Sequence, residues 1–126
     1  MNSNKKILII EDDELIIKLL KFILEKEGYR LNIIKDGLSA IEQIHVINPD
    51  MIITDILLPY KSGLEVICFV KEKFNKTPII VLSSLGEEEH SVSEAFTLGA
   101  DDFIAKPFNP NELILRVKRL LNHTFK

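Results

Sequence analysis

The chain has 126 residues, of which 46% are hydrophobic, and its formal net charge is −3. This length suits one compact domain with its own core and is too short for two. The slightly acidic balance excludes the strongly basic surface with which proteins hold nucleic-acid phosphates. We therefore expect a single domain over residues 1–126, with its core over residues 6–121, and no binding of nucleic acid by it.

Cysteine usage and the N-terminus bear on location. Cys68 is the single cysteine, which excludes an internal disulfide. The opening letters MNSNKK lead into a short strand-like run rather than the longer apolar stretch of a signal peptide. No segment approaches the roughly 20 apolar residues of a membrane span. These features predict a soluble, cytoplasmic protein with no membrane contact.

Five candidate strands appear along the chain. Aliphatic runs without polar alternation occupy Lys6–Ile10, Met51–Asp55 and residues 78–82, and such runs are typical of strands buried on both faces of a parallel sheet. Residues 30–35 and 101–105 form shorter or more polar runs. These two suit the edges of the sheet.

Each candidate strand is followed by apolar residues at helical spacing. In chain order, the predicted stripes are Leu15, Leu19, Phe22 and Ile23, ending at Gly28; Leu38, Ile41 and Ile44, ending before Pro49; Leu64, Ile67 and Val70; Val92, Ala95 and Phe96, ending before Gly99; and Leu113, Val117, Leu120 and Leu121. Asp13 is a candidate cap for the first helix, and Asn109 with Pro110 and Glu112 is typical of the start of the last one.

Strict alternation of strand and helix predicts a parallel sheet with right-handed crossovers and helices on both faces. Five such units are too few for a closed eight-fold barrel. The predicted fold is therefore α/β: an open, doubly wound, five-stranded parallel sheet in a three-layer sandwich. Ligands of such sheets bind beyond the carboxyl ends of the strands, where the strand order reverses.

Polar residues stand where the predicted strands end. They are Glu11 and Asp12 after the first strand, Asp55 at the end of the third, Ser83 and Ser84 after the fourth, and Lys106 after the fifth. The three carboxylates converge if the first and third strands are neighbours. Clustered carboxylates without histidine or cysteine nearby suit magnesium.

Four motifs together resemble the receiver domain of two-component response regulators, the CheY-like family with a flavodoxin-like (βα)5 fold. They are IIEDDE after the first strand, TDILLP around Asp55, VLSS at the fourth strand, and GADDFIAKPF from Gly99 to Phe108. The resemblance covers residues 6–121. Each motif alone is a weak signal, but four in the right order at the right strand ends are a strong one.

The resemblance implies that Asp55 is a phosphoacceptor, which takes a phosphoryl group from a phosphohistidine on a sensor histidine kinase or a phosphotransfer protein. Lys106 would pair with that group, and Ser83 would donate a hydrogen bond to it. Mg²⁺, for which Mn²⁺ can substitute, would neutralise charge on the transferred oxygens. Its implied ligands are Glu11, Asp12, Asp55 and the backbone carbonyl of Leu57.

The resemblance also implies how the signal is passed on. Ser83 and Phe103 would move together and change the face made by the fourth and fifth helices and the fifth strand. A downstream effector protein, or a covalently linked output domain, would read that face. The chain would catalyse its own phosphorylation and dephosphorylation without a turnover substrate, and the Lys106–Pro107 peptide bond is expected to be cis.

Two departures from the family pattern carry further predictions. Leu57 and Leu85 are apolar where many members carry polar side chains beside the phosphoryl group. A leucine can only exclude an attacking water, so we expect slow self-dephosphorylation.

The second departure concerns a weak homodimer through the face just described. Its expected salt bridges are only partly supplied, because the fourth helix offers His90 where a lysine or arginine is usual. The available charges are Asp101, Asp102, Arg116, Lys118 and Arg119. The sequence leaves the dimer open.

Other interpretations account for parts of this pattern. Acids such as Glu11 suit a helix start, and Asp55 alone could form a turn. A flavodoxin-like cofactor binder needs a phosphate-cradling loop where these acids stand. An aspartyl-phosphate phosphatase generally needs a second acid at the position of Leu57, and a pseudo-receiver would not need the complete set of acids, hydroxyl and lysine. Whether the chain stands alone or is part of a longer regulator stays open, as do its kinase and its output.

Overall fold

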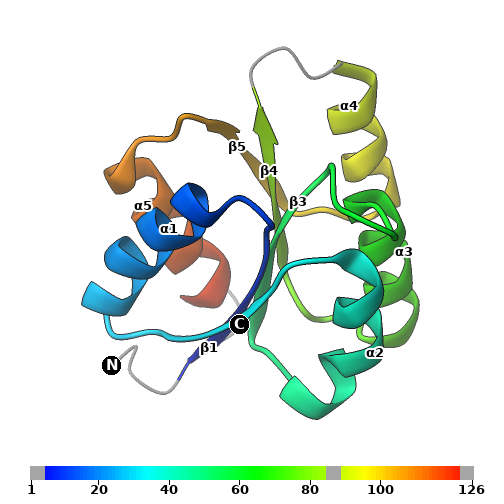
Figure 1. The fold of residues 1–126 in the computed structure, drawn as a ribbon, viewed down its shortest axis with the longest axis horizontal. Helices are drawn as coiled ribbons and strands as arrows, with labels where there is room; N and C mark the ends of the chain where they lie inside the picture. The colour runs from blue at the N-terminus through cyan, green and yellow to red at the C-terminus, as the bar shows by residue number, and fades with distance from the viewer. Residues whose placement is uncertain (1–4, 85–88, 123–126) are drawn as a thin grey trace.

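The computed structural model describes residues 5–84 and 89–122, in which strands and helices alternate (Figure 1). The strands are β1 (Lys6–Ile10), β2 (Arg30–Ile34), β3 (Met51–Asp55), β4 (Ile79–Ser84) and β5 (Asp102–Lys106). The helices are α1 (Glu14–Lys26), α2 (Gly37–Ile47), α3 (Gly63–Lys73), α4 (Glu89–Leu98) and α5 (Pro110–Asn122).

The strands form one parallel sheet in the order β2-β1-β3-β4-β5. The predicted doubly wound α/β fold is confirmed. The order reverses between β1 and β3, which are neighbours, and this is the point at which such sheets place their ligand site. The pairing of Ile10 with Thr54 brings the residues that follow them, Glu11 and Asp55, to the same edge.

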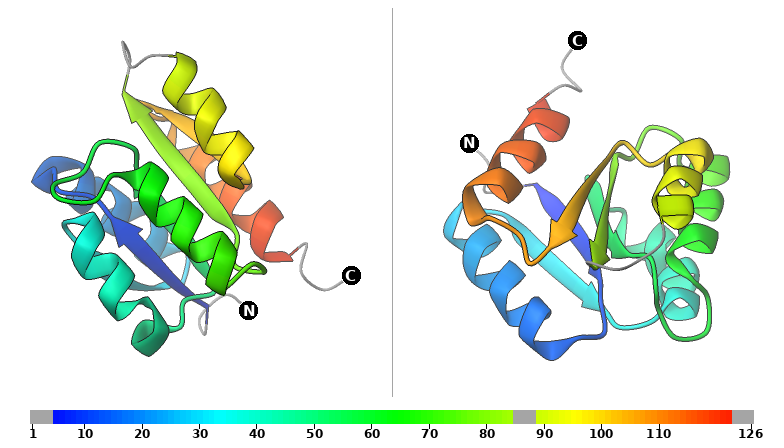
Figure 2. Two further views of the ribbon diagram at one scale, coloured as in Figure 1. Left: turned by 90° about the vertical axis from the view of Figure 1, so that its right-hand side faces the viewer. Right: turned by 90° about the horizontal axis from the view of Figure 1, so that it is seen from above.

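Helices cover both faces of the sheet and create two apolar cores (Figure 2). Helices α1 and α5 pack on one face, where Leu20 and Val117 are fully buried. Helices α2, α3 and α4 pack on the other, where Ile44, Ile67 and Ala95 are buried. The strands between them are apolar on both faces, which explains their uninterrupted aliphatic sequences.

The strand bounds differ slightly from the prediction. The second strand ends one residue earlier, the fourth runs from Ile79 to Ser84, and the fifth begins at Asp102 rather than one residue before it. Asp101 lies just outside the fifth strand, where its carboxylate accepts a hydrogen bond of 2.8 Å from the Ile79 N–H and its own N–H donates one of 2.9 Å to the Ile79 carbonyl.

The predicted apolar stripe of α1 is right at Ile23 and wrong at its other three positions. Leu15 and Phe22 are 74% and 68% exposed, and Leu19 is 38% exposed. Besides the predicted Ile23, the helix buries Ile17, Leu20 and Leu24. Because α1 carries apolar residues on two sides, spacing alone could not identify the side that packs on the sheet. Leu38 of α2 and Phe96 of α4 are likewise 40% and 45% exposed.

The predicted helix starts are confirmed. The Asp13 side chain accepts hydrogen bonds from the backbone N–H groups of Leu15 and Ile16, and Asn109 caps α5 in the same way. The Lys106–Pro107 bond is cis. Among the residues described, no helix is both long and apolar enough to span a membrane.

Candidate functional site

Three carboxylates meet at the carboxyl ends of β1 and β3. One oxygen each from Glu11, Asp12 and Asp55 lies within 4.8 Å of the other two. Glu11 is fully buried and Asp55 is 6% exposed, whereas Asp12 is exposed to solvent. The cluster is therefore open on the Asp12 side, from which an ion or a small molecule can enter.

Lys106 bridges the two buried acids. Its Nζ donates hydrogen bonds to Asp55 Oδ2 at 2.8 Å and to Glu11 Oε1 at 3.1 Å. The other oxygen of Asp55 accepts the Ile56 N–H at 2.8 Å, and Oε2 of Glu11 accepts the Asp13 N–H at 3.1 Å. Both buried carboxylates thus have the partners that burial of a charge requires.

Burial raises the pKa of Glu11 above its ordinary value of 4.5, and the charge of Asp55 adds to the shift, while the Asp13 N–H and Lys106 oppose it. For Lys106, burial disfavours the charged form. The hydrogen bond and charge of Asp55, followed by those of Glu11, outweigh this and raise the pKa of Lys106 above 10.5. The lysine is therefore charged at neutral pH and is held by the acids.

The chemistry of these groups fits a hard divalent cation. Three carboxylate groups and one ammonium carry a formal charge of −2 in a partly buried space. A divalent cation would neutralise that charge, and a few carboxylates with room for water or phosphate oxygens are typical ligands of Mg²⁺. The acidic cluster is thus able to hold a metal ion.

Ser83 lies on β4, beside the strand that carries Asp55, and Phe103 lies on β5, one strand farther from the acids. Asp55 pairs with Leu82 and Phe103 pairs with Val81, so Ser83 follows the partner of Asp55 and stands two residues beyond the partner of Phe103. Ser83 is 6% exposed. The half-buried Phe103 contacts Phe96 of α4, with 6.2 Å between ring centroids. The predicted hydroxyl and aromatic therefore lie along one strand pair that leads from the acids to α4.

Of the two leucines predicted to affect the phosphoryl group, Leu57 is among the residues that the structure describes. The Leu57 side chain is 65% exposed in the segment after Asp55. Leu85 lies outside the described residues.

The charges considered for a homodimer are paired within the chain. Arg116 donates two hydrogen bonds of 2.8 Å to Asp102, and Arg119 donates one of 2.7 Å to the same carboxylate. Asp101 pairs with Lys71 at 3.3 Å, and Lys118 pairs with Glu27 at 3.2 Å. Sequence reasoning identified the residues but missed these partners, because nothing in a linear spacing tells an internal pair from one between copies.

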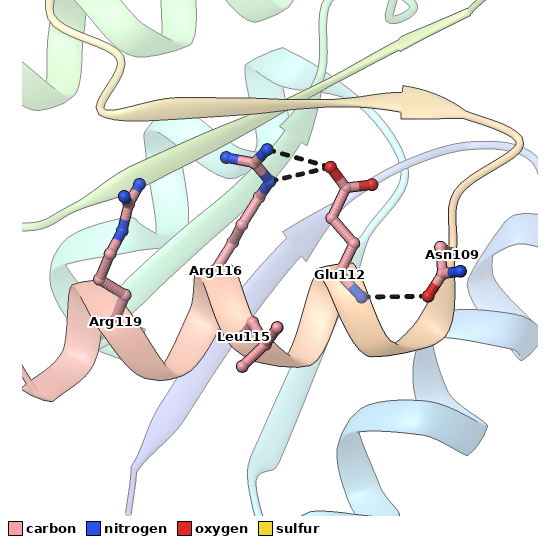
Figure 3. Close-up of a pocket in the computed structure, with 5 residues that line it drawn as sticks. All are labelled: Asn109, Glu112, Leu115, Arg116 and Arg119. Carbon is pink, nitrogen blue, oxygen red and sulfur yellow. Dashed lines mark hydrogen bonds and ion pairs between the residues drawn. The ribbon is translucent and has the colours of Figure 1, made fainter.

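A shallow groove of about 590 Å³ runs along the same face of α5 (Figure 3). Its lining residues are Asn109, Glu112, Leu115, Arg116 and Arg119. Leu115 is 68% exposed and lines the groove together with these charged side chains, so it offers a partner an apolar contact.

The fold and the acidic edge define a class of protein, and comparison with known proteins identifies it. A model of the response regulator receiver domain family matches residues 7–118. The chain belongs to this family and is a receiver domain of two-component systems.

Named relatives agree. The chain is 42% identical over 119 residues to the transcriptional regulatory protein ResD of Bacillus subtilis, covering 94% of this chain and 49% of ResD. It is 41% identical over 121 residues to the transcriptional regulatory protein SrrA of Staphylococcus aureus, covering 96% and 49%. The receiver domain of the Francisella response regulator 1452 is 33% identical, with a TM-score of 0.86 over 96% of this chain and 99% of that one. The chain therefore spans about half the length of the curated relatives it matches.

Proposed function

We propose that Asp55 accepts a phosphoryl group from a phosphohistidine on a sensor histidine kinase or phosphotransfer protein, in a reaction that needs Mg²⁺. The observation that carries the proposal is the hydrogen bond of 2.8 Å between Asp55 and Lys106 inside a cluster of three carboxylates. Lys106 orients this carboxylate, which lies in one cluster with the solvent-exposed Asp12.

In the proposed step, a carboxylate oxygen of Asp55 attacks the phosphorus atom. The P–N bond of the phosphohistidine breaks, its electron pair stays on the imidazole nitrogen, and an acyl phosphate forms on Asp55. Lys106 shifts its ammonium from the carboxylate to the new phosphoryl oxygens, and Ser83 donates its hydroxyl proton as a hydrogen bond to one of them.

Glu11, Asp12, Asp55 and the Leu57 carbonyl would hold the cation, with Mn²⁺ as a substitute for Mg²⁺. A bound cation supplies positive charge beside the oxygens of the transferred group. Glu11 and Asp12 do not react in this step. They would act by binding the cation and by keeping Asp55 in place.

The switch we propose links Ser83 to Phe103. Movement of the Ser83 hydroxyl toward the phosphoryl group frees space beside β5, into which Phe103 turns. Support comes from their placement on adjacent strands and from the contact of Phe103 with Phe96 of α4. The face of α4, β5 and α5 would then differ between the two states and would be read by an effector or a linked output domain.

The phosphodonor protein is proposed to dock on α1. This helix begins at Glu14, two residues after Asp12, and its Leu15 and Phe22 are large apolar side chains that stay mostly exposed. Exposed apolar residues spaced along one helix beside a reaction site are suited to contact with a partner helix.

The proposal describes a signalling domain that catalyses its own phosphorylation and dephosphorylation and has no turnover substrate. The proposed setting is the cytoplasm, in keeping with the free and exposed Cys68. A homodimer through α4, β5 and α5 would have to exchange the internal pairs of Asp102 for pairs between copies. Sedimentation of the phosphorylated protein tests this, and a monomer at high concentration would rule the dimer out.

Intact mass after incubation with acetyl phosphate tests the proposed reaction. The expected result is a gain of one phosphoryl group that requires Mg²⁺ and is lost in Asp55→Asn. Asp50→Asn is a matched control, because Asp50 lies at the opposite edge of the sheet, where it bonds to the Lys6 N–H. An adduct that persists in Asp55→Asn would contradict the assignment of Asp55.

A further inference from the structure

Residues 56–62 form the segment between β3 and α3 and include Leu57. The two halves of this segment pack differently against the rest of the fold. Its first half packs inward, through Ile56, which is 2% exposed, and the partly buried Leu58. Its second half, Pro59 to Lys61, has exposed side chains, and Tyr60 is 84% exposed. Packing of side chains therefore does not fix the second half.

The backbone of this second half is nevertheless constrained. Tyr60 has a φ of 69°, in the left-handed region that residues with a side chain rarely adopt. A conformation of this kind persists only when the surroundings impose it. The side chains of this half are exposed, and so is the ion pair of 3.6 Å between Lys61 and Glu65, so contacts made by the backbone are the stronger constraint.

Gly37, the first residue of α2, makes those contacts. Its N–H donates a hydrogen bond of 3.3 Å to the Pro59 carbonyl, and a Cβ placed on it would lie 1.8 Å from the Lys61 carbonyl oxygen. Gly37 does not have a positive φ. Glycine is therefore needed at this position for close approach of two backbones and not for its own conformation.

Gly63 holds the other end of the segment. Its N–H donates a hydrogen bond of 2.8 Å to the Ile56 carbonyl, and a Cβ on it would lie 2.1 Å from the Asp55 carbonyl oxygen. Leu57 thus stands between two backbone attachments, Ile56 to Gly63 and Pro59 to Gly37. The start of α2 is itself fixed, because the Asp36 side chain accepts the Ser39 N–H at 2.7 Å.

We propose that Gly37 is a positioning residue for the cation site: by admitting the Lys61 backbone against the start of α2, it fixes the segment that presents the Leu57 carbonyl beside Asp55. The inference rests on the proposed function, since it assumes that this carbonyl is a ligand. Gly37 touches neither the cation nor the phosphoryl group and acts through the position of the segment. A methyl group at residue 37 would push the Lys61 carbonyl away and displace the segment.

The test compares Mn²⁺ binding by the wild type, Gly37→Ala and Gly99→Ala, measured from the free Mn²⁺ signal in electron paramagnetic resonance. Gly99 is a matched control at the amino end of β5, on the edge of the sheet opposite the acids. Its φ of 125° strains any side chain, and an added Cβ would lie 2.6 Å from the flexible Lys71 side chain. Urea unfolding of each protein reports the loss of stability separately.

We expect Gly37→Ala to bind Mn²⁺ about ten-fold more weakly, the scale on which groups that orient metal ligands act. Gly99→Ala should bind as the wild type does while unfolding at lower urea. If Gly37→Ala does not fold, Gly37→Ala combined with Lys61→Gly replaces it. The glycine removes the Lys61 Cβ, 2.9 Å from the introduced methyl group, and frees the backbone at residue 61 so that its carbonyl oxygen, 1.8 Å from that group, can move aside. Weaker binding than in Lys61→Gly alone is expected.

The outcomes separate the two proposals. Equal Mn²⁺ affinity in Gly37→Ala and the wild type would overturn the role of Gly37 and leave the cation site standing. Equal weakening in Gly37→Ala and Gly99→Ala would also overturn it, because the effect would then follow stability alone. A wild type that binds no Mn²⁺ would overturn the cation site and this inference together.

Discussion

Lys106 donates a hydrogen bond of 2.8 Å to Asp55 across 51 residues of sequence. The same ammonium reaches the fully buried Glu11 at 3.1 Å. One lysine therefore balances two acids that would otherwise repel each other at the edge of the sheet. This arrangement makes the site sensitive to the loss of the lysine, to pH and to cations, and each of these can be measured.

Replacing Lys106 with methionine should lower stability in the absence of metal. The change leaves two buried carboxylates without their cation, which is expected to cost about 3 kcal/mol of unfolding free energy near neutral pH. The cost should shrink in mild acid, where Glu11, with its raised pKa, takes up a proton. Urea unfolding in EDTA at the two pH values measures both effects.

Lys118→Met is the matched control for this prediction. Lys118 pairs with Glu27 at 3.2 Å, but both side chains are partly exposed, so the change should cost less than about 1 kcal/mol. A loss in Lys106→Met that is as small as this, or that does not depend on pH, would contradict the role assigned to Lys106.

The raised pKa of Glu11 predicts how metal binding and stability depend on pH. A cation needs the ionised carboxylate, so Mn²⁺ binding should weaken in acid from a pH above the ordinary glutamate value of 4.5. For the metal-free protein the sign is opposite. A raised folded pKa contributes stability that is present below the unfolded pKa and is lost as pH rises through the folded pKa.

Glu11→Gln should therefore bind Mn²⁺ more weakly than the wild type, and its Mn²⁺ affinity should depend less on pH in that range. Without metal at neutral pH, it should unfold at a higher urea concentration than the wild type. Titration of Mn²⁺ at several pH values, with urea unfolding alongside, gives all three quantities. Unaltered pH dependence in Glu11→Gln would show that another group controls binding.

The exposed side of α1 predicts a variant that separates two phosphodonors. Phe22→Asp should leave phosphorylation by acetyl phosphate intact, because Phe22 is 68% exposed and remote from the chemistry. Transfer from a phosphohistidine protein should fall about ten-fold, the scale of losing one apolar anchor from an interface. Initial rates with the two donors give the comparison.

Val46→Asp on α2 is the control for Phe22→Asp, since Val46 is an apolar residue that is 75% exposed on another helix. It should transfer at the wild-type rate from both donors. If Val46→Asp and Phe22→Asp slow the protein donor equally, the effect is one of added charge, and docking on α1 is wrong.

The leucines at positions 57 and 85 predict a long-lived phosphoryl group. Neither side chain can position a water for attack on the acyl phosphate, so Leu57→Asn combined with Leu85→Glu should shorten its half-life. The decay of the phosphorylated species, followed by intact mass after removal of the donor, measures the half-life. A wild type that loses phosphate as fast as the variant would refute the prediction.

Much of the fold was predictable because its determinants are local. Aliphatic runs identified the strands, Asp13 and Asn109 identified helix starts, and alternation of strand and helix predicted an open, doubly wound parallel sheet. The carboxyl ends of parallel strands share one edge, so Glu11, Asp55 and Lys106 were expected there. Their meeting also required β1 and β3 to be neighbours, which the sequence left as a condition and the structure shows.

The features that the sequence did not predict are of two kinds. Some depend on which of two similar surfaces is buried or paired, and others are contacts between backbone segments far apart in the sequence. Helix α1 is apolar on two sides, so the buried side was misassigned. Asp102 could pair within the chain or between copies, and only the structure shows the internal pair with Arg116. The approach of Gly37 to Lys61 leaves no pattern in the sequence at all.

The most direct test of the central claim is to locate the phosphoryl group by borohydride reduction. Borohydride reduces an acyl phosphate to a primary alcohol with release of phosphate, so phosphorylated Asp55 would become homoserine. We predict, after treatment with acetyl phosphate and Mg²⁺, a homoserine at position 55 in the peptide that spans β3, and none when Mg²⁺ is omitted. Homoserine at position 11 or 12 instead, or a phosphorylated protein that yields no homoserine, would contradict the account.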